Sequence, residues 1–313
     1  MIGRDELERA ARLIRAGGLV AFPTETVYGL GANALNAEAV ERIFSVKGRP
    51  HESPVIIHTG TIEMARTLVQ HWPREAEILA NRYWPGPLTL VLPKHPNIPA
   101  VVTAGLDTVA LRVPSHPIAL ALIREAGLPI AAPSANRFAQ LSPTSAEHVR
   151  KALGNDVDMI LDGGPTSVGI ESTVVSLARD VPCLLRPGII SSAELESLIG
   201  RMTVGSNVAG PHASPGMHAR HYSPRTRLVL VKNGRLPAKG RGAYLWIHER
   251  AETEESIPMP ANPAAYAAIL YDTLHKLDEA AYEWVAVERP PDSSEWAGIV
   301  DRLERAAAED DGR

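Results

Sequence analysis

Two cationic side chains, Lys47 and Arg49, flank a glycine in the segment Lys47-Gly48-Arg49-Pro50. A lysine ammonium supplies a point charge and an arginine guanidinium supplies a bidentate fork, and this pair suits a polyphosphate. The segment follows a helical stretch, and basic residues before a glycine are also typical of an ordinary helix C-terminus. The motif alone therefore leaves both a phosphate site and a helix end open.

Arg112 interrupts the apolar run at residues 109–113. An arginine within a strand is seldom buried without a partner, so we expect a carboxylate or a ligand beside it unless it faces outward. Ser134 and Asn136 place a hydroxyl and an amide just after the apolar run 129–132. Because ligands commonly bind at strand ends in α/β sheets, these residues are candidates as well.

Hydroxyl residues gather in two further segments, FPTETVYGLG at 22–31 and GIEST at 169–173. The first is too polar for a protein core, and it lacks the glycine pattern of a dinucleotide fingerprint or a P-loop. An ordinary strand-to-helix connection would also use its threonines to satisfy backbone groups. Arg186 adds a cation at the end of an apolar run, whereas a histidine such as His58 at a strand end is by itself more often structural.

An alternation of helices and strands must position these segments, which is typical of an α/β protein. Apolar residues at helical spacing predict helices at 5–16, around 40–44, from about 61, and at 117–126, 145–153, 192–200, 266–277 and 296–303. Apolar runs predict strands at 19–22, 55–58, 88–92, 109–113, 129–132, 159–161, 173–177, 228–231, 243–247 and 284–287. Thr144 and Glu147 have the spacing of a capping box for the helix at 145–153.

The length of 313 residues exceeds the usual ceiling for one hydrophobic core, so two domains are expected. Between them lies a stretch rich in glycine, proline, serine and histidine that has no helical or strand periodicity. We place the larger domain at 1–203, a linker or lid at 204–225 and the smaller domain at 226–313. The linker histidines lack acidic or cysteine partners at metal-binding spacing, so no metal site made of protein side chains is expected.

Composition excludes several classes of protein. The formal charge of -4 argues against avid, sequence-independent binding to nucleic acid, which draws on many lysines and arginines. The apolar runs are shorter than the roughly 20 residues of a membrane span, and the N-terminal residues lack a signal-peptide pattern. A single cysteine, Cys183, favours a reducing compartment. We therefore expect a cytoplasmic protein without zinc, haem or flavin.

Taken together and in this order, the motifs resemble the YrdC-like family of threonylcarbamoyl-AMP synthases, in its longer two-domain form. The matching segments span about residues 10–225 and include GGLVAFPTETVYGLGANA, KGRP, YWPGPLTLVL, LRVP, APSAN, SPTSAEHV, GIESTVV, LLRPG and SPGMHARHYSP. The resemblance implies a twisted, mixed-sheet α/β domain with a large concave cavity. It also implies a linker that folds over the mouth of the cavity and a smaller C-terminal α/β domain of Rossmann-like type.

The resemblance implies functional residues too. The family's catalytic tetrad at the nucleotide end of the cavity corresponds to Lys47, Arg49, Ser134 and Asn136. Further ATP contacts correspond to Ser53, Thr108, Ser142, Arg186 and Tyr222, and the threonine contacts correspond to Thr26, His58, Arg112, Ala132 and Ser172. The chain departs from the family pattern at 51–54, which includes Ser53, and at 137–140, which precedes Ser142.

By this resemblance the protein is a nucleotidyltransferase that makes threonylcarbamoyl-AMP and pyrophosphate from L-threonine, bicarbonate and ATP. This is the first step toward threonylcarbamoyladenosine in tRNA that reads ANN codons. Mg²⁺ would arrive on the ATP phosphates, and the product would pass to a tRNA threonylcarbamoyl transferase complex. We expect weak or no direct tRNA binding, no membrane association, and a monomer or dimer.

One alternative function belongs to another class, a double-stranded RNA or ribosome-associated binding protein, because related single domains have been linked to RNA. The net charge disfavours RNA binding as the main role. A third reading, carbamoyl transfer from carbamoyl phosphate, would require zinc-finger and acylphosphatase segments that this chain lacks.

Overall fold

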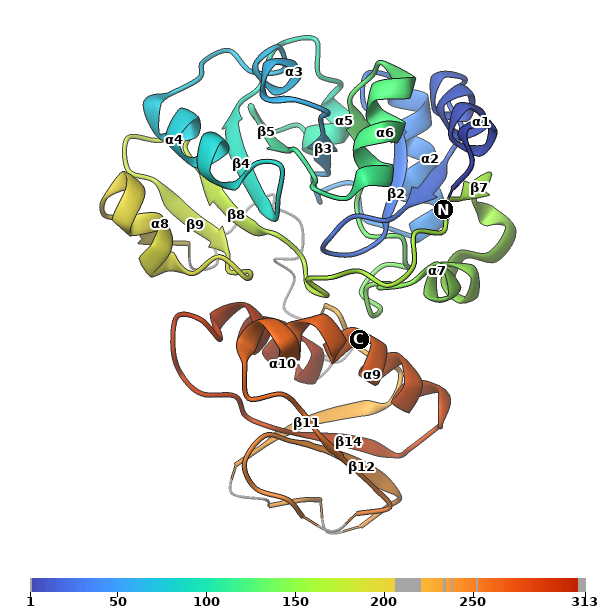
Figure 1. Ribbon diagram of the computed structural model, residues 1–313, viewed down its shortest axis with the longest axis vertical. Coiled ribbons are helices and arrows are strands. Elements are labelled where there is room, and N and C mark those ends of the chain that lie inside the picture. The colour runs from blue at the N-terminus through green and yellow to red at the C-terminus, as the bar shows by residue number, and fades with distance from the viewer. Residues whose placement is uncertain (1, 206–220, 233–234, 238, 252, 309–313) are drawn as a thin grey trace.

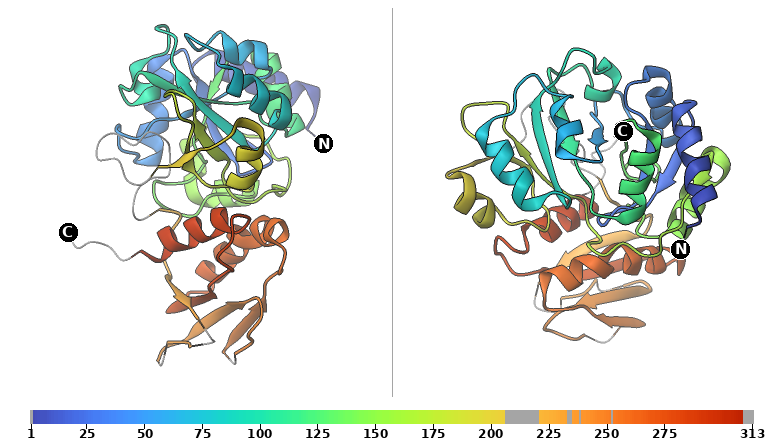
Figure 2. Two further views of the ribbon diagram at one scale, coloured as in Figure 1. Left: turned by 90° about the vertical axis from the view of Figure 1, so that its left-hand side faces the viewer. Right: turned by 45° about the horizontal axis from the view of Figure 1, so that its top comes forward.

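Two sheets organise the protein, whose computed structural model describes residues 2–205, 221–232, 235–237, 239–251 and 253–308. The N-terminal elements build a larger body, and the C-terminal elements build a smaller body that lies below it in Figure 1. Both views in Figure 2 keep the smaller body against the same side of the larger one. A second, C-terminal domain is therefore present, as the length of the chain predicts.

The larger sheet has ten strands among the described residues and mixes parallel with antiparallel pairs. Its order is β10-β9-β8-β4-β5-β3-β6-β2-β1-β7. The strands are β1 (Val20–Phe22), β2 (Gly29–Asn33), β3 (Ile56–His58), β4 (Leu88–Pro93), β5 (Thr108–Arg112), β6 (Ile130–Ala131), β7 (Met159–Ile160), β8 (Thr173–Ser176), β9 (Cys183–Arg186) and β10 (Thr203–Val204). In the central strands His58 is in register with Arg112, so residues distant in sequence become neighbours.

Helices cover this sheet. Each has an apolar stripe, which it buries against the sheet or a neighbouring helix. They are α1 (Arg4–Arg15), α2 (Ala37–Lys47), α3 (Ile62–Arg66), α4 (Arg74–Tyr83), α5 (Ala100–Thr103), α6 (Pro117–Ala126), α7 (Ala146–Leu153) and α8 (Ser192–Ile199), with a 3₁₀ turn η1 (Gly154–Asp156). Helix α1 packs against α6, and α4 packs against α8.

The end of α2 positions the first cationic motif. Asn36 caps the start of this helix by accepting a hydrogen bond from the backbone N–H of Ala39. Gly48 ends it in the left-handed conformation at φ 61°, which a residue without Cβ adopts at little cost. The chain reverses there, and both Lys47 and Arg49 are buried.

The smaller sheet is parallel throughout its described strands, with order β11-β14-β12-β13. Its elements are β11 (Arg227–Val231), β12 (Gly242–Trp246), β13 (Glu255–Pro258), α9 (Pro263–Glu279), β14 (Trp284–Glu288) and α10 (Ala297–Ala307). Helices α9 and α10 lie between this sheet and the larger body (Figure 1). They share one apolar core with residues of the larger body, including Val27, Leu141 and Ile170.

Most expected elements are present, and the differences have identifiable causes. Strands β2, β9, β10 and β13 and helices α4 and α5 were not anticipated. Strand β2 forms an antiparallel pair with β1, so the segment at 22–31 is part of a hairpin and not a strand-to-helix connection. Small residues hide this strand from a pattern search: a Cβ at Gly31 would lie 2.7 Å from the ring of Phe22.

The capping box expected from Thr144 and Glu147 is wrong. Helix α7 begins one residue later, because Ser145 is the N-cap and accepts from the backbone N–H of His148. The hydroxyl of Thr144 instead contacts His148 Nδ1 at 3.3 Å. Adjacent hydroxyl residues make similar sequence signals, and local contacts with His148 select between them.

Two further expectations concern the linker between the domains and membrane-spanning helices. Of the predicted linker at 204–225, residues 206–220 lie outside the described part of the chain. No described helix combines the length and the apolar character that crossing a membrane requires.

Candidate active site

One cavity of the larger body collects many of the predicted site residues. It lies among the β1–β2 turn, the ends of β3 and β5, the loop after β6, the approach to β8, and the chain just before β11. The predicted residues that line it are Thr26, Arg49, His58, Arg112, Ala132, Ser134, Ser172, Arg186 and Tyr222. The structure thus unites nucleotide and threonine candidates in one place.

The other predicted residues do not line this cavity: Lys47, Ser53, Thr108, Asn136 and Ser142. Thr108 begins β5, whose opposite end carries Arg112. Lys47 Nζ donates to the backbone carbonyl of Ser134 at 2.6 Å, to the carbonyl of Asn136, and at 3.3 Å to Asn136 Oδ1. Asn136 Nδ2 in turn donates to the carbonyl of Gln140 at 2.8 Å. In this conformation Lys47 and Asn136 hold the loop that presents Ser134.

Burial, followed by the charges of Arg49 and Arg137, holds the pKa of Lys47 well below its usual value. The carbonyl and amide oxygens around Nζ oppose this effect by stabilising the ammonium form. These oxygens carry only partial negative charges. An anionic ligand in the cavity would supply a full negative charge and would stabilise the ammonium form of Lys47 further.

Arg49 is a buried cation held by neutral groups. Its Nε donates to the carbonyl of Ser53 at 3.3 Å and its Nη2 to the carbonyl of Pro54 at 3.0 Å. Burial is the main cause that lowers its pKa to about 10, and Arg186 contributes in the same direction. Within the described chain no carboxylate pairs with Arg49, so an anionic ligand is the natural counter-charge.

Arg112 is buried and paired, so its outward-facing alternative is excluded. Its Nη2 lies 2.8 Å from Glu25 Oε1, its Nη1 donates to Thr26 Oγ1 at 2.9 Å, and its Nε donates to the Gly86 carbonyl at 3.2 Å. The expectation of a carboxylate partner is confirmed. The sequence did not identify Glu25 as that partner, although this carboxylate stands in the same polar segment as Thr26.

His58 presents a neutral imidazole to the cavity. Burial, with a smaller contribution from Arg112, lowers its pKa to about 3. Its Nδ1 has no hydrogen-bond partner among the described residues, although the side chain is buried. A buried polar atom without a partner costs free energy, and a ligand group that bonded to it would recover that cost.

Arg186 and Ser172 form one unit of the cavity wall. Arg186 Nε donates to the carbonyl of Ser172 and Nη2 donates to Ser172 Oγ, both at 3.1 Å. Ser172 Oγ also lies 2.7 Å from Thr89 Oγ1. Burial lowers the pKa of Arg186.

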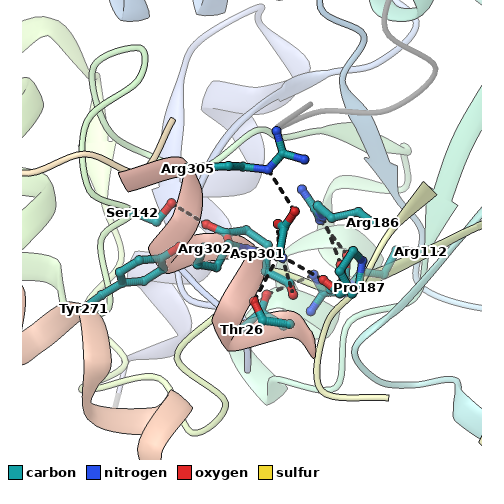
Figure 3. A network of polar contacts seen from close by, with 12 residues as sticks. Thr26, Arg112, Ser142, Arg186, Pro187, Tyr271, Asp301, Arg302 and Arg305 are labelled. Carbon is teal, nitrogen blue, oxygen red and sulfur yellow. Dashed lines mark hydrogen bonds and ion pairs between the residues drawn. The ribbon is translucent and has the colours of Figure 1, made fainter. Parts of the chain in front are cut away.

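The residue next to Ser172 connects this wall to the smaller body. Glu171 lines the cavity, and its carboxylate accepts hydrogen bonds from Ser142, from Tyr271 of α9 and from Arg302 of α10. Figure 3 shows Ser142 and Tyr271 close to Arg302 at the junction of the two bodies. Sequence reasoning missed Glu171 and Arg302, since nothing in either local pattern reveals a partner about 130 residues away.

The end of the linker occupies part of the cavity. His221 and Tyr222 both line it, and Tyr222 is buried with a left-handed φ of 60°. The remaining free volume is about 50 Å³. Ligand pockets usually have roughly 300 Å³ or more, so in this conformation the cavity is small for a ligand pocket.

The chain is thus a two-domain α/β protein in which buried arginines converge on one cavity, and such a cavity suits small anionic ligands. A family model described as "Telomere recombination" matches residues 12–188, and one described as "Threonylcarbamoyl-AMP synthase, C-terminal domain" matches residues 190–308. The chain therefore belongs to the two-domain, YrdC-like threonylcarbamoyl-AMP synthase family.

Individual relatives are similar over most of the chain. The threonylcarbamoyl-AMP synthase of Bacillus subtilis is 43% identical over 321 residues, which cover 96% of this chain and 93% of the relative. The threonylcarbamoyl-AMP synthase of Pyrococcus abyssi is 52% identical over 230 residues, which cover 72% of this chain and 68% of the relative. The crystal structure of P. abyssi Sua5 complexed with L-threonine matches with a TM-score of 0.91 at 39% identity, covering 98% of this chain and 95% of that one.

Proposed function

We propose that this protein is an L-threonylcarbamoyladenylate synthase, which converts L-threonine, bicarbonate and ATP to threonylcarbamoyl-AMP and pyrophosphate. The observation that carries the proposal is the convergence of Arg49, Arg112 and Arg186 on one cavity in a chain of this family. Relatives bear the name of this activity, and a similar protein has been crystallised with L-threonine.

The threonine end of the site is assigned to Thr26, His58, Arg112, Ala132 and Ser172, which all line the cavity. The guanidinium of Arg112 suits the threonine carboxylate, which would share it with Glu25. His58 Nδ1 offers a polar contact to the amino acid, and Ala132 leaves room beside it. Threonine is thereby oriented with its amino group toward the nucleotide end.

The nucleotide end is assigned to the tetrad Lys47, Arg49, Ser134 and Asn136, with further contacts from Ser53, Thr108, Ser142, Arg186 and Tyr222. Arg49 and Arg186 neutralise phosphate oxygens, while Lys47 and Asn136 hold the loop of Ser134. The threonine amine captures carbon dioxide from bicarbonate as an N-carboxylate. One of its oxygens then attacks the α-phosphorus, and the bond to the pyrophosphate leaving group breaks.

This displacement makes the enzyme a nucleotidyltransferase and depends on positioning and charge neutralisation, with no covalent nucleophile. ATP enters as its magnesium complex. The magnesium ion would be carried by the phosphate oxygens and would neutralise part of their charge. Glu171, which lines the cavity, and Glu25 both contact arginines.

The biological setting is assigned on the same basis. The product passes to a tRNA threonylcarbamoyl transferase complex, for the modification of tRNA that reads ANN codons, in the cytoplasm. Direct tRNA binding is weak, since the formal charge is -4. We keep the division into a catalytic domain at 1–203, a linker at 204–225 and a C-terminal domain at 226–313, in a monomer or dimer.

The test is pyrophosphate release from ATP with Mg²⁺ and bicarbonate, in the presence of threonine, serine, valine or no amino acid. We expect release that requires both threonine and bicarbonate. Valine should be rejected more strongly than serine. With valine, the group that bonds the threonine hydroxyl is left unpaired, whereas serine only lacks the methyl group, which is worth roughly 1 to 3 kcal/mol. Folded protein that binds ATP without threonine-dependent release would refute the proposal and favour the RNA-binding alternative.

Arg112→Lys tests the threonine end. Lysine keeps the positive charge but loses the fork, so the KM for threonine should rise about tenfold or more while the KM for ATP changes little. Arg66→Lys, at an exposed pair with Glu77, is the matched control and should behave as the parent protein. An unchanged KM for threonine in Arg112→Lys would remove Arg112 from the amino-acid site.

A further inference from the structure

The smaller body touches the larger one through closely approaching backbones on both sides of the segment that leads into β8. A Cβ at Gly169 would lie 2.2 Å from the carbonyl oxygen of Ala267 in α9. A Cβ at Gly298 of α10 would lie 2.6 Å from the carbonyl oxygen of Gly188, just after β9. The two helices are therefore seated against the loop before β8, which carries Ser172, and the loop after β9, which ends at Arg186.

Arg302 of α10 projects into this contact and is the largest fully buried side chain in the described structure. Its Nε donates to Glu171 Oε2 at 2.7 Å, its Nη2 to the Glu171 carbonyl at 3.3 Å, and its Nη1 to the Pro187 carbonyl at 2.9 Å (Figure 3). Its guanidinium also lies 5.2 Å from the ring centre of Tyr222. A single side chain of the C-terminal domain thus contacts two residues that line the cavity, Glu171 and Tyr222, and the carbonyl of Pro187 next to Arg186.

Glu171 depends on Arg302 for its charge balance. Its carboxylate is buried, and the other donors to it, Ser142 and Tyr271, are neutral. Burial is the largest single effect on the pKa of Glu171 and raises it, but Arg302, Arg186 and the hydrogen bond from Ser142 together outweigh burial, so that pKa lies below its usual value. Arg302 is the strongest of the lowering effects. Without Arg302, Arg186 is the next cation that the buried carboxylate would engage.

Arg186 is one of the groups assigned to ATP, and it lies beside Ser172 in the same wall. A carboxylate that paired with Arg186 would repel the phosphates and draw the guanidinium away from them. Neutralising Glu171 from outside the catalytic domain prevents this.

We propose that Arg302 is a positioning residue for the nucleotide end of the site, which neutralises Glu171 and so keeps the charge of Arg186 for ATP. The proposal rests on the proposed function, and it gives the C-terminal domain a part in substrate binding. Arg302 touches neither substrate; it acts through Glu171, Arg186 and the Pro187 carbonyl.

The experiment compares Arg302→Met, Arg302→Lys and the double variant Glu171→Gln/Arg302→Met in the full chain. We expect Arg302→Met to raise the KM for ATP about tenfold, with a smaller change in the KM for threonine and in kcat. Arg302→Lys, which keeps the charge but not the fork, should be intermediate. The double variant should recover most of the affinity for ATP, because the carboxylate is removed together with its cation.

Lys151→Met is the matched control, since Lys151 also pairs across the two bodies, with Glu279 at 2.6 Å, but at the surface. It should leave the KM for ATP unchanged. A double variant as impaired as Arg302→Met would overturn the proposal, because a purely structural fastening between domains is not restored by removing Glu171. An unchanged KM for ATP in Arg302→Met would do the same.

Calorimetric titration with ATP keeps this test separate from that of the activity. If the parent protein releases no pyrophosphate, the proposed function fails, yet the dissociation constant for ATP still compares Arg302→Met with the double variant. Should Arg302→Met not fold, Arg302→Lys and the double variant carry the comparison, and equal affinity for ATP in the parent, Arg302→Lys and the double variant would refute the role of Arg302.

Discussion

The buried cations of the site are compensated in different ways. Arg112 has a carboxylate partner in Glu25, whereas Lys47 and Arg49 rest on backbone carbonyls and an amide oxygen. Carbonyl dipoles stabilise a buried charge without cancelling it. The proposed threonine end is therefore closer to neutral before substrate arrives, and the proposed polyphosphate end retains a positive charge.

His58 makes stability depend on pH. Its pKa is lowered from 6.5 to about 3 in the folded protein, mainly by burial. The unfolded chain takes up a proton there first, so the stabilisation is complete above pH 6.5 and is lost as the pH falls from 6.5 toward 3. Below pH 6.5, His58→Gln should lessen the decline of unfolding free energy by up to about 1.4 kcal/mol per pH unit.

Urea unfolding at pH 7.5, 6 and 5 measures how the unfolding free energy changes with pH, on both sides of the usual pKa of histidine. His148 and His275, which stack at 3.9 Å, also have lowered pKa values because of burial, so the difference between variant and parent isolates His58. His71→Gln, at an exposed position, is the control. Equal slopes for His58→Gln and the parent would mean that His58 is protonated in the folded state.

Helix termini and tight turns place the functional groups at the scale of elements. Gly48 reverses the chain after α2, so Lys47 and Arg49 point inward from opposite sides of a turn. The pairing of β1 with β2 holds Thr26 at a hairpin end, where it meets Arg112. These devices are local in sequence, but each acts on a residue from another element.

The absence of a side chain at Gly298 allows α10 to approach the larger body closely. Gly298→Val would drive its side chain into the Gly188 backbone, 2.6 Å from the carbonyl oxygen. Because backbone cannot move aside as a side chain can, we expect unfolding free energy to fall by about 1 to 3 kcal/mol, and product formation to decrease. Urea unfolding and pyrophosphate release measure the two effects. Glu304→Ala, on the exposed side of α10, should change neither; parent-like behaviour of Gly298→Val would contradict the seating of α10.

Across the whole molecule, one apolar core joins both bodies. Val27, Leu141 and Ile170 of the larger body belong to the same buried cluster as Leu270 of α9 and Ile299 of α10. Separating the bodies would expose this apolar surface and leave Glu171 and Arg302 buried or solvated without each other. The two domains should therefore unfold together.

Tryptophan fluorescence can test this cooperativity. The variant Trp72→Phe/Trp84→Phe keeps only Trp246, Trp284 and Trp296, all in the smaller body, so its fluorescence reports that body alone. We expect its urea transition to coincide with that of far-ultraviolet circular dichroism, which reports the whole chain. A fluorescence transition at lower urea would show that the smaller body unfolds first. Arg302→Met should separate the two transitions if the ion pair links the bodies.

The sequence predicted elements best where periodicity was strong and local. The helix at 117–126 was predicted with the bounds of α6, and the strand at 88–92 falls within β4. Strand β2 was missed because close packing against Phe22 demands small residues and so removes the β-branched residues that identify a strand. The cap of α7 was misplaced because Thr144 and Ser145 are chemically equivalent until His148 engages one of them.

For the site, the motifs predicted candidate residues, and the fold decided which groups each of them contacts. Arg112 and Arg49 stand out in the sequence, since arginines among apolar residues demand partners. That Arg112 pairs with Glu25, while Arg49 has no carboxylate partner among the residues that the structure describes, followed only from the fold. The family's ordered motifs determined the reaction class from sequence alone.

The dependence of the cavity on the C-terminal domain could be decided only by tertiary structure. Glu171 and Arg302 lie 131 positions apart and share no local pattern, and their 2.7 Å contact exists because α10 docks beside β8 and β9. Local propensity and periodicity act over a few residues, whereas a buried charge is balanced by whatever the folded chain brings beside it.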